Sequence, residues 1–100
     1  MGADIQQLKK KITPVAEKYG LAAVYLFGSR ARGDFNQKSD YDFYVDAPML
    51  EDMFELAALF TDMKDTLKAE VDIVLKPDKY TKLDDYIAQA VERDGVLVYG

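Results

Sequence analysis

The sequence has 100 residues, 49% of them hydrophobic and 31% charged, which is the composition of a globular chain and excludes a disordered one. Cysteine and histidine are both absent, so disulfides, thiolate zinc sites and histidine-based catalytic triads are excluded. The net charge of −5 argues against extensive nucleic-acid contact. No segment has the length of a membrane span or the character of a signal peptide. We therefore expect one cytoplasmic domain over residues 1–100 without a membrane partner.

The first quarter of the chain predicts two helices and then a strand. Apolar residues recur at helical spacing over residues 5–19. Thr13 and Pro14 predict a break, with Thr13 as the N-cap and Pro14 as the first residue of a second helix. Gly20 is expected to cap that helix at its C-terminus. Residues 21–27 are all apolar, which favours a central strand buried on both faces.

The rest of the chain alternates between strand and helix patterns. We expect a polar loop over 28–39, a strand over 41–46, a helix over 50–67, a strand over 70–75, a helix from Leu83 that stops at Gly95, and an edge strand over 96–99. The apolar stripe near the first of these two helices is interpreted as core, not as a binding groove, and comprises Met49, Met53, Phe54, Phe60 and Met63. This order favours an α/β (α+β) fold with a small mixed sheet flanked by helices.

Three aspartates form the first part of a candidate site. Asp40 and Asp42 lie two residues apart at the start of a strand, so their side chains share a face. Paired carboxylates repel each other unless a cation lies between them, and their oxygens suit Mg²⁺ or Mn²⁺. Asp72 lies in the next predicted strand within an apolar setting, where an unpaired charge is costly. If the two strands are neighbours, all three carboxylates can converge on one site.

The loop after the first strand forms the second part. Gly28 would let a ligand approach the backbone closely, and Ser29 is expected to be the N-cap of a short turn. That turn would offer N–H groups and positive charge to a phosphate. Arg30, Arg32 and Lys38 make this the one basic loop of an acidic chain. A triphosphate bound there would meet cations held by the aspartates, as in two-metal phosphoryl chemistry.

These residues also resemble a known family. The pattern consists of Gly28-Ser29, a ten-residue gap, Asp40-Tyr41-Asp42 and the later Val71-Asp72-Ile73. It resembles the signature of the DNA polymerase beta-like nucleotidyltransferase superfamily, and the string from Leu26 to Asp42 is similar to its minimal members, the MNT domains. The resemblance implies that Gly28 and Ser29 hold the triphosphate of ATP and that Asp40 and Asp42 bind two Mg²⁺ ions. It also implies that Asp72 completes the metal site and helps to activate the acceptor.

The same resemblance implies a biological role. MNT proteins are typically antitoxins that transfer AMP from ATP to a tyrosine of a partner HEPN ribonuclease toxin, so we expect a hetero-oligomer with such a toxin. Two other functions stay open: a binding module that neutralises its partner without catalysis, and an enzyme that acts on a small molecule or an RNA end. Each residue also has a plainer interpretation. Asp40 and Asp42 could be turn acids, Asp72 a strand-edge charge, and the two arginines surface charges.

Overall fold

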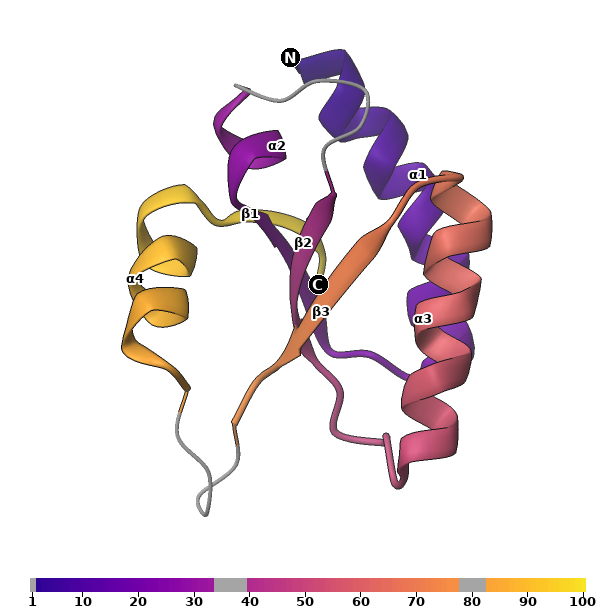
Figure 1. Cartoon of the computed structure of the whole chain (residues 1–100). Helices are drawn as coiled ribbons and strands as arrows, with labels where there is room; N and C mark the ends of the chain where they lie inside the picture. The colour runs from indigo at the N-terminus through magenta and orange to yellow at the C-terminus, as the bar shows by residue number, and fades with distance from the viewer. Residues whose placement is uncertain (1, 34–39, 78–82) are drawn as a thin grey trace.

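The computed structural model describes residues 2–33, 40–77 and 83–100, and their side chains from residue 5 onward. The elements in chain order are α1 (Gly2–Tyr19), β1 (Ala23–Phe27), α2 (Ser29–Arg32), β2 (Tyr41–Asp46), α3 (Met53–Leu67), β3 (Val71–Leu75), α4 (Asp85–Asp94) and β4 (Val96–Tyr99) (Figure 1). The strands form one sheet in the order β3-β2-β1-β4. β2 and β3 are parallel, and β1 is antiparallel to both β2 and β4. The predicted mixed sheet flanked by helices is therefore confirmed.

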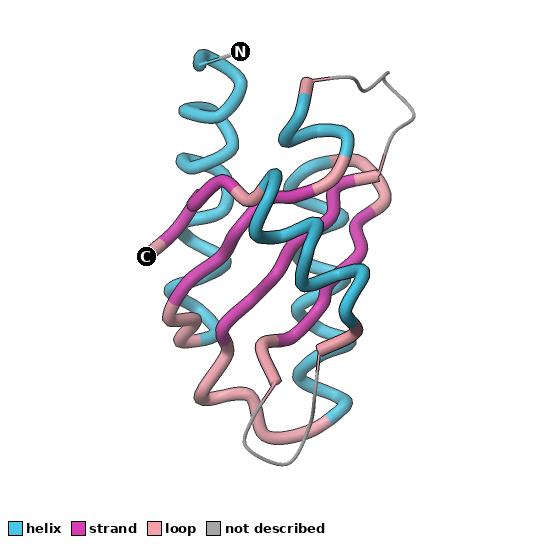
Figure 2. Tube along the Cα trace, turned by 90° about the vertical axis from the view of Figure 1, so that its left-hand side faces the viewer, coloured by secondary structure: helices cyan, strands magenta, loops and turns pink. Residues whose placement is uncertain are grey.

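The helices cover the two faces of the sheet unequally. α1 and α3 lie on one face, and α4 is the described helix that lies across the other (Figures 1 and 2). The hydrophobic core lies on the α1–α3 side, where Val24, Leu26, Phe43 and Val45 are buried. Because side chains alternate along a strand, the residues between them face α4. The polar members of β2 and β3 therefore share the less covered face.

α1 is one continuous helix with Pro14 inside it, so the predicted break at Thr13 and Pro14 is wrong. A proline inside a helix removes a backbone hydrogen bond and costs about 3 kcal/mol. Packing outweighs that cost, because buried residues on both sides of the proline belong to the same core: Leu8 and Ile12 before it, Val15 and Ala16 after it. Burying a large apolar side chain contributes about 1.5–3 kcal/mol. The Thr13 hydroxyl also donates to the Lys9 carbonyl at 2.7 Å instead of capping a new helix.

The end of α1 follows the prediction. Gly20 has a φ of 64°, its N–H donates to the Glu17 carbonyl, and the Leu21 N–H donates to the Ala16 carbonyl at 2.9 Å. This pair of bonds is a Schellman cap, for which glycine is favoured. The central strand β1 begins two residues later at Ala23. Its predicted burial on both faces is only partly right: Ala23 and Tyr25 are half-buried, because α4 covers their side of the sheet incompletely.

α3 begins after Asp52, whose side chain accepts a hydrogen bond from the Glu55 N–H at 2.9 Å. Leu59 and Met63 are its buried residues. The prediction that the whole methionine and phenylalanine stripe is core is wrong, because Met49, Met53 and Phe54 are 66%, 74% and 86% exposed. Met49 precedes the helix, Met53 lies in its first turn, and Phe54 is out of phase with the buried stripe. No described helix has the length and apolar character needed to cross a membrane.

Candidate active site

The candidate site lies where β1 ends and β2 begins. The antiparallel register pairs Phe27 with Asp42, and the parallel register pairs Asp42 with Asp72. The strands that carry the two acids are therefore neighbours, which was the condition for their convergence. Asp40 lies just before β2 and is exposed. Gly28 directly follows Phe27, so the glycine loop and the acids meet at the same end of the sheet.

Negative charge accumulates at Asp42. Burial raises the pKa of this carboxyl, the charges of Asp72 and Asp40 raise it further, and Arg32 opposes them. Oxygen donors with excess negative charge suit a hard divalent cation. As the side chains lie, no three carboxylates of the described residues stand close enough to enclose a metal ion. Asp42 and Asp72 fit a divalent ion by their chemistry and adjacency, and further ligands would have to come from Asp40 in another position or from oxygens of the substrate.

Gly28 is required by both backbone conformation and space. Its φ of 78° and ψ of −157° lie in a region that is essentially restricted to glycine. A Cβ at this position would stand 2.5 Å from Oδ2 of Asp42. The Gly28 carbonyl accepts from the N–H groups of Ala31 and Arg32 at 3.1 Å, so Gly28 is the N-cap of α2. The prediction that Ser29 is the N-cap is wrong, because Ser29 is the first residue of the helix and Gly28 precedes it as the cap.

Arg32 is held at the site by a carboxylate of the last helix. Its Nη1 donates to Oδ2 of Asp94 at 3.0 Å, and Nη2 of Arg93 donates to the same oxygen at 3.0 Å. The Asp94 side chain is only 6% exposed. An acid at the C-terminal end of a helix is unfavourable for the helix dipole, and the two guanidinium groups offset this effect. The hydrogen bond from Arg93 is the main cause that lowers the pKa of Asp94. Asp94 thus ties α4 to α2 and fixes Arg32 beside Asp42.

These residues surround a pocket of about 330 Å³. Its lining comprises Phe27, Gly28, Ser29, Arg32, Asp42, Asp72, Val74, Tyr86, Ile87, Ala90 and Arg93. Sequence reasoning missed the contribution of α4, whose apolar residues were assigned to an ordinary amphipathic helix. The available signal was the combination of an aromatic residue, a small residue and an arginine at positions 86, 90 and 93, which helical spacing places on one face.

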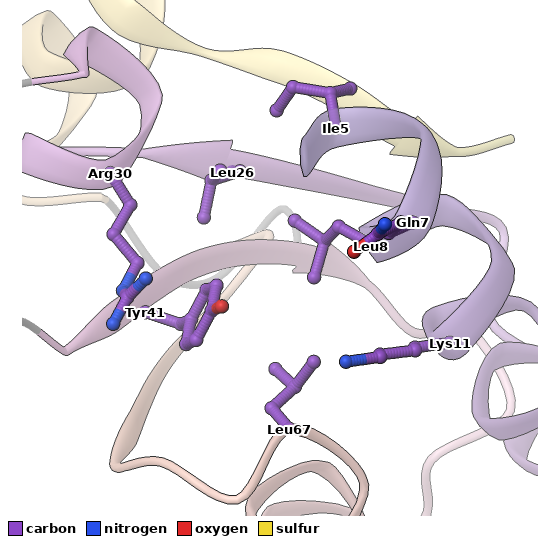
Figure 3. A pocket seen from close by; sticks show the side chains of 8 residues that line it. All are labelled: Ile5, Gln7, Leu8, Lys11, Leu26, Arg30, Tyr41 and Leu67. Carbon is purple, nitrogen blue, oxygen red and sulfur yellow. The ribbon is translucent and has the colours of Figure 1, made fainter. Parts of the chain in front are cut away.

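Arg30 lies elsewhere. Its guanidinium stacks over the Tyr41 ring, 4.0 Å from the ring centroid, on the α1 side of the sheet (Figure 3). There it lines a separate cavity of about 180 Å³ together with Ile5, Gln7, Leu8, Lys11, Leu26, Tyr41 and Leu67. α2 therefore directs Arg32 toward the acidic pocket and Arg30 toward the opposite face. Lys38, the third basic residue of the predicted loop, lies outside the described residues.

Comparison with known proteins agrees with this geometry. Residues 10–100 match the Polymerase beta, Nucleotidyltransferase family. A relative from Methanocaldococcus jannaschii that carries the name of a protein adenylyltransferase is 33% identical over 95 residues, covering 95% of this chain and 92% of the relative. The protein adenylyltransferase MntA of Thermococcus cleftensis is 30% identical over 82 residues, covering 82% of this chain and 79% of MntA.

A solved structure is similar over nearly the whole chain. A crystal structure of a toxin–antitoxin with AMP-PNP aligns at a TM-score of 0.73 and 26% identity, covering 92% of this chain and 73% of that one. The family match spans the glycine loop and all three aspartates. The chain therefore belongs to the polymerase beta nucleotidyltransferase family and, within it, to the minimal nucleotidyltransferases of the MntA protein adenylyltransferase type.

Proposed function

We propose that this enzyme transfers AMP from ATP to a tyrosine hydroxyl of a partner HEPN ribonuclease toxin and thereby acts as its antitoxin in a hetero-oligomer. The observation that carries the proposal is the pairing of Asp42 with Asp72 beside the Gly28 loop, within one pocket. The names of its relatives and the toxin–antitoxin complex with AMP-PNP support it. Because ATP supplies the transferred group, we place the reaction in the cytoplasm.

The glycine loop, Arg32 and the aspartates then have separate tasks in the transfer. Gly28 and Ser29 hold the triphosphate, and Arg32 adds positive charge beside it. The acceptor oxygen bonds to the α-phosphorus, the bond from that phosphorus to the oxygen that bridges to the β-phosphate breaks, and pyrophosphate leaves with the electron pair. The proton of the acceptor hydroxyl passes to the carboxylate of Asp72. Asp40, Asp42 and Asp72 would hold two Mg²⁺ ions, with Mn²⁺ as a substitute, and such ions supply charge stabilisation for the pyrophosphate and the attacking oxygen.

Labelled ATP tests this function directly. The purified chain is incubated with Mg²⁺ and ATP labelled at the α-phosphate, with and without the proposed HEPN toxin. We expect label on a toxin tyrosine, located by mass spectrometry, and a loss of roughly two orders of magnitude or more in the Asp42→Asn variant. Asp65→Asn is the matched control, because it removes the same charge from an exposed position on α3. It should transfer AMP at the wild-type rate.

The same assay distinguishes catalysis from simple binding. A stable complex that forms without labelled toxin would contradict AMP transfer and would establish neutralisation by binding alone. Label on added RNA or on a small molecule, with the toxin unlabelled, would assign a different acceptor.

A further inference from the structure

The pocket has two chemically different ends. One end holds the glycine loop, Arg32, Asp42 and Asp72, which are groups suited to phosphates and cations. The rest of the lining is largely apolar and aromatic, and Val74, Tyr86, Ile87 and Ala90 belong to it. A nucleotide has the same division, because a charged triphosphate and a flat, largely apolar base lie at its two ends. The proposed function uses the first end only.

α4 presents its wall residues as one stripe. Tyr86, Ala90 and Arg93 lie at positions i, i+4 and i+7 of the helix, so their side chains share a face. The Asp84 side chain accepts from the N–H groups of Tyr86 and Ile87 at 2.9 and 3.4 Å, which fixes the first turn of the helix. Ala90 is buried and contributes only a methyl group, so it leaves space between its two larger neighbours.

Tyr86 is the unusual member of this stripe. Its side chain lines the pocket, yet the residue is 77% exposed. Exposed aromatic rings at the edge of a pocket are suited to stacking, because a planar ligand can cover the ring without displacing core residues. Arg93 is already bonded to Asp94 through Nε and Nη2, at 3.2 and 3.0 Å. Phe27, the other aromatic residue of the lining, is buried, so Tyr86 is the aromatic residue of the pocket whose ring a ligand can reach.

We propose that Tyr86 is the nucleobase platform of this enzyme and that the purine of ATP stacks on its ring, with Ala90 providing the space for the base. This inference rests on the proposed function and extends it, because it assigns base binding to the last helix of the nucleotidyltransferase domain itself. Stacking recognises the flat face of a base, so the platform selects nucleotides over free polyphosphate.

Two ligands separate the base end of the pocket from its phosphate end. Calorimetry measures the Kd of α,β-methylene ATP, in which the bond that breaks in AMP transfer is blocked, and of inorganic tripolyphosphate, both with Mg²⁺. We expect Tyr86→Ala to weaken binding of the nucleotide roughly 5- to 150-fold and to leave binding of tripolyphosphate unchanged. Tyr86→Phe keeps the ring and should bind the nucleotide like the wild type. Phe54→Ala, which removes a similarly exposed ring from α3, is the matched control and should change neither Kd.

The possible failures are distinguishable. Equal nucleotide affinity in the wild type and in Tyr86→Ala would overturn the platform, as would an equal loss for both ligands, which would place Tyr86 at the phosphate end. Loss of toxin binding with nucleotide affinity intact would make Tyr86 a partner contact instead. If the proposed AMP transfer fails in the labelling assay, these binding measurements still test Tyr86, because they require no transfer.

Discussion

At Gly28 a single missing Cβ decides how closely the loop can approach the acids. The left-handed φ excludes a side chain, and so does the short distance at which a Cβ would stand from the carboxylate of Asp42. The same closeness brings the amides around Ser29 next to the negative charge of β2. A phosphate that binds between the loop and β2 needs both the amides and the aspartates, because the amides attract it and a cation held by the aspartates neutralises its charge.

Gly28→Ala should lower the free energy of unfolding by about 1–3 kcal/mol and abolish AMP transfer, because the Cβ strains the backbone and displaces Asp42. Urea unfolding measures the loss. Asp42→Ala is then made both in the wild type and in Gly28→Ala, and its effect on the free energy of unfolding is compared. In Gly28→Ala it removes the carboxylate that the new Cβ contacts, so it should destabilise less there than in the wild type, or even stabilise. A second change with the same effect in both backgrounds would show that the contact with Asp42 is not the source of the strain.

The raised pKa of Asp42 makes the metal-free protein sensitive to pH. The folded state binds the Asp42 proton more tightly than the unfolded state does, so at neutral pH the ionised carboxylate destabilises the fold. This destabilisation is relieved as the pH falls through the raised pKa toward the ordinary carboxyl pKa of about 4. In the presence of EDTA, Asp42→Asn should therefore have a higher Tm than the wild type at pH 7, and the difference should shrink at acid pH. A pH-independent difference would assign the effect to packing.

At the scale of elements, α4 does more than cover the sheet. It supplies one wall of the pocket, and through Asp94 it orients Arg32 of α2, which is 62 residues away in sequence. Asp94 also separates the like charges of Arg32 and Arg93, which lie close enough to influence each other. The position of α4 on the sheet and the electrostatics of the site are therefore coupled.

Asp94→Asn should raise the KM for ATP and lower the Tm, because two guanidinium groups lose their shared partner and Arg32 is released from its place beside Asp42. Steady-state kinetics and thermal unfolding measure the two effects. Glu92→Gln is the control, since it removes an equal charge from an exposed position on the same helix. If the two variants behave alike, net charge and not the connection between helices is responsible.

At the scale of the molecule, a chain of 100 residues with one thinly covered sheet face has little stability in reserve. A ligand that binds only the folded state adds RT ln(1 + [L]/Kd), which is about 2.7 kcal/mol when its concentration is 100 times Kd. The candidate site lies on the thinly covered face, so we expect nucleotide binding there to bridge the sheet and α4.

We therefore expect Mg²⁺ and ATP together to raise the Tm by on the order of 10 °C at that concentration. ATP with EDTA should give a much smaller increase, because the charges of the triphosphate and the aspartates then repel each other. Differential scanning calorimetry of the wild type and of Asp42→Asn measures both effects. An unchanged Tm at millimolar Mg²⁺ and ATP would contradict a competent site.

The sequence by itself determined the features that depend on local chain chemistry. The alternation of apolar and polar residues identified the strands that carry Asp42 and Asp72, and the helical spacing of apolar residues identified the amphipathic helices. The spacing of Gly28-Ser29 from the aspartates was enough to indicate the family, because a glycine at a strand end and paired acids are specific chemical requirements. Each of these features lies within a few residues of chain or within one motif.

Only the tertiary structure decided what depends on neighbours far apart in sequence. Burial of residues on both sides of Pro14 kept the proline inside a helix, although the local signal predicted a break. Strand order brought Asp72 beside Asp42, and α2 placed Arg30 and Arg32 on opposite faces of the sheet. The position of α4 placed Tyr86 in the wall of the pocket. Packing free energy summed over many contacts determines these arrangements, and no single stretch of sequence contains that sum.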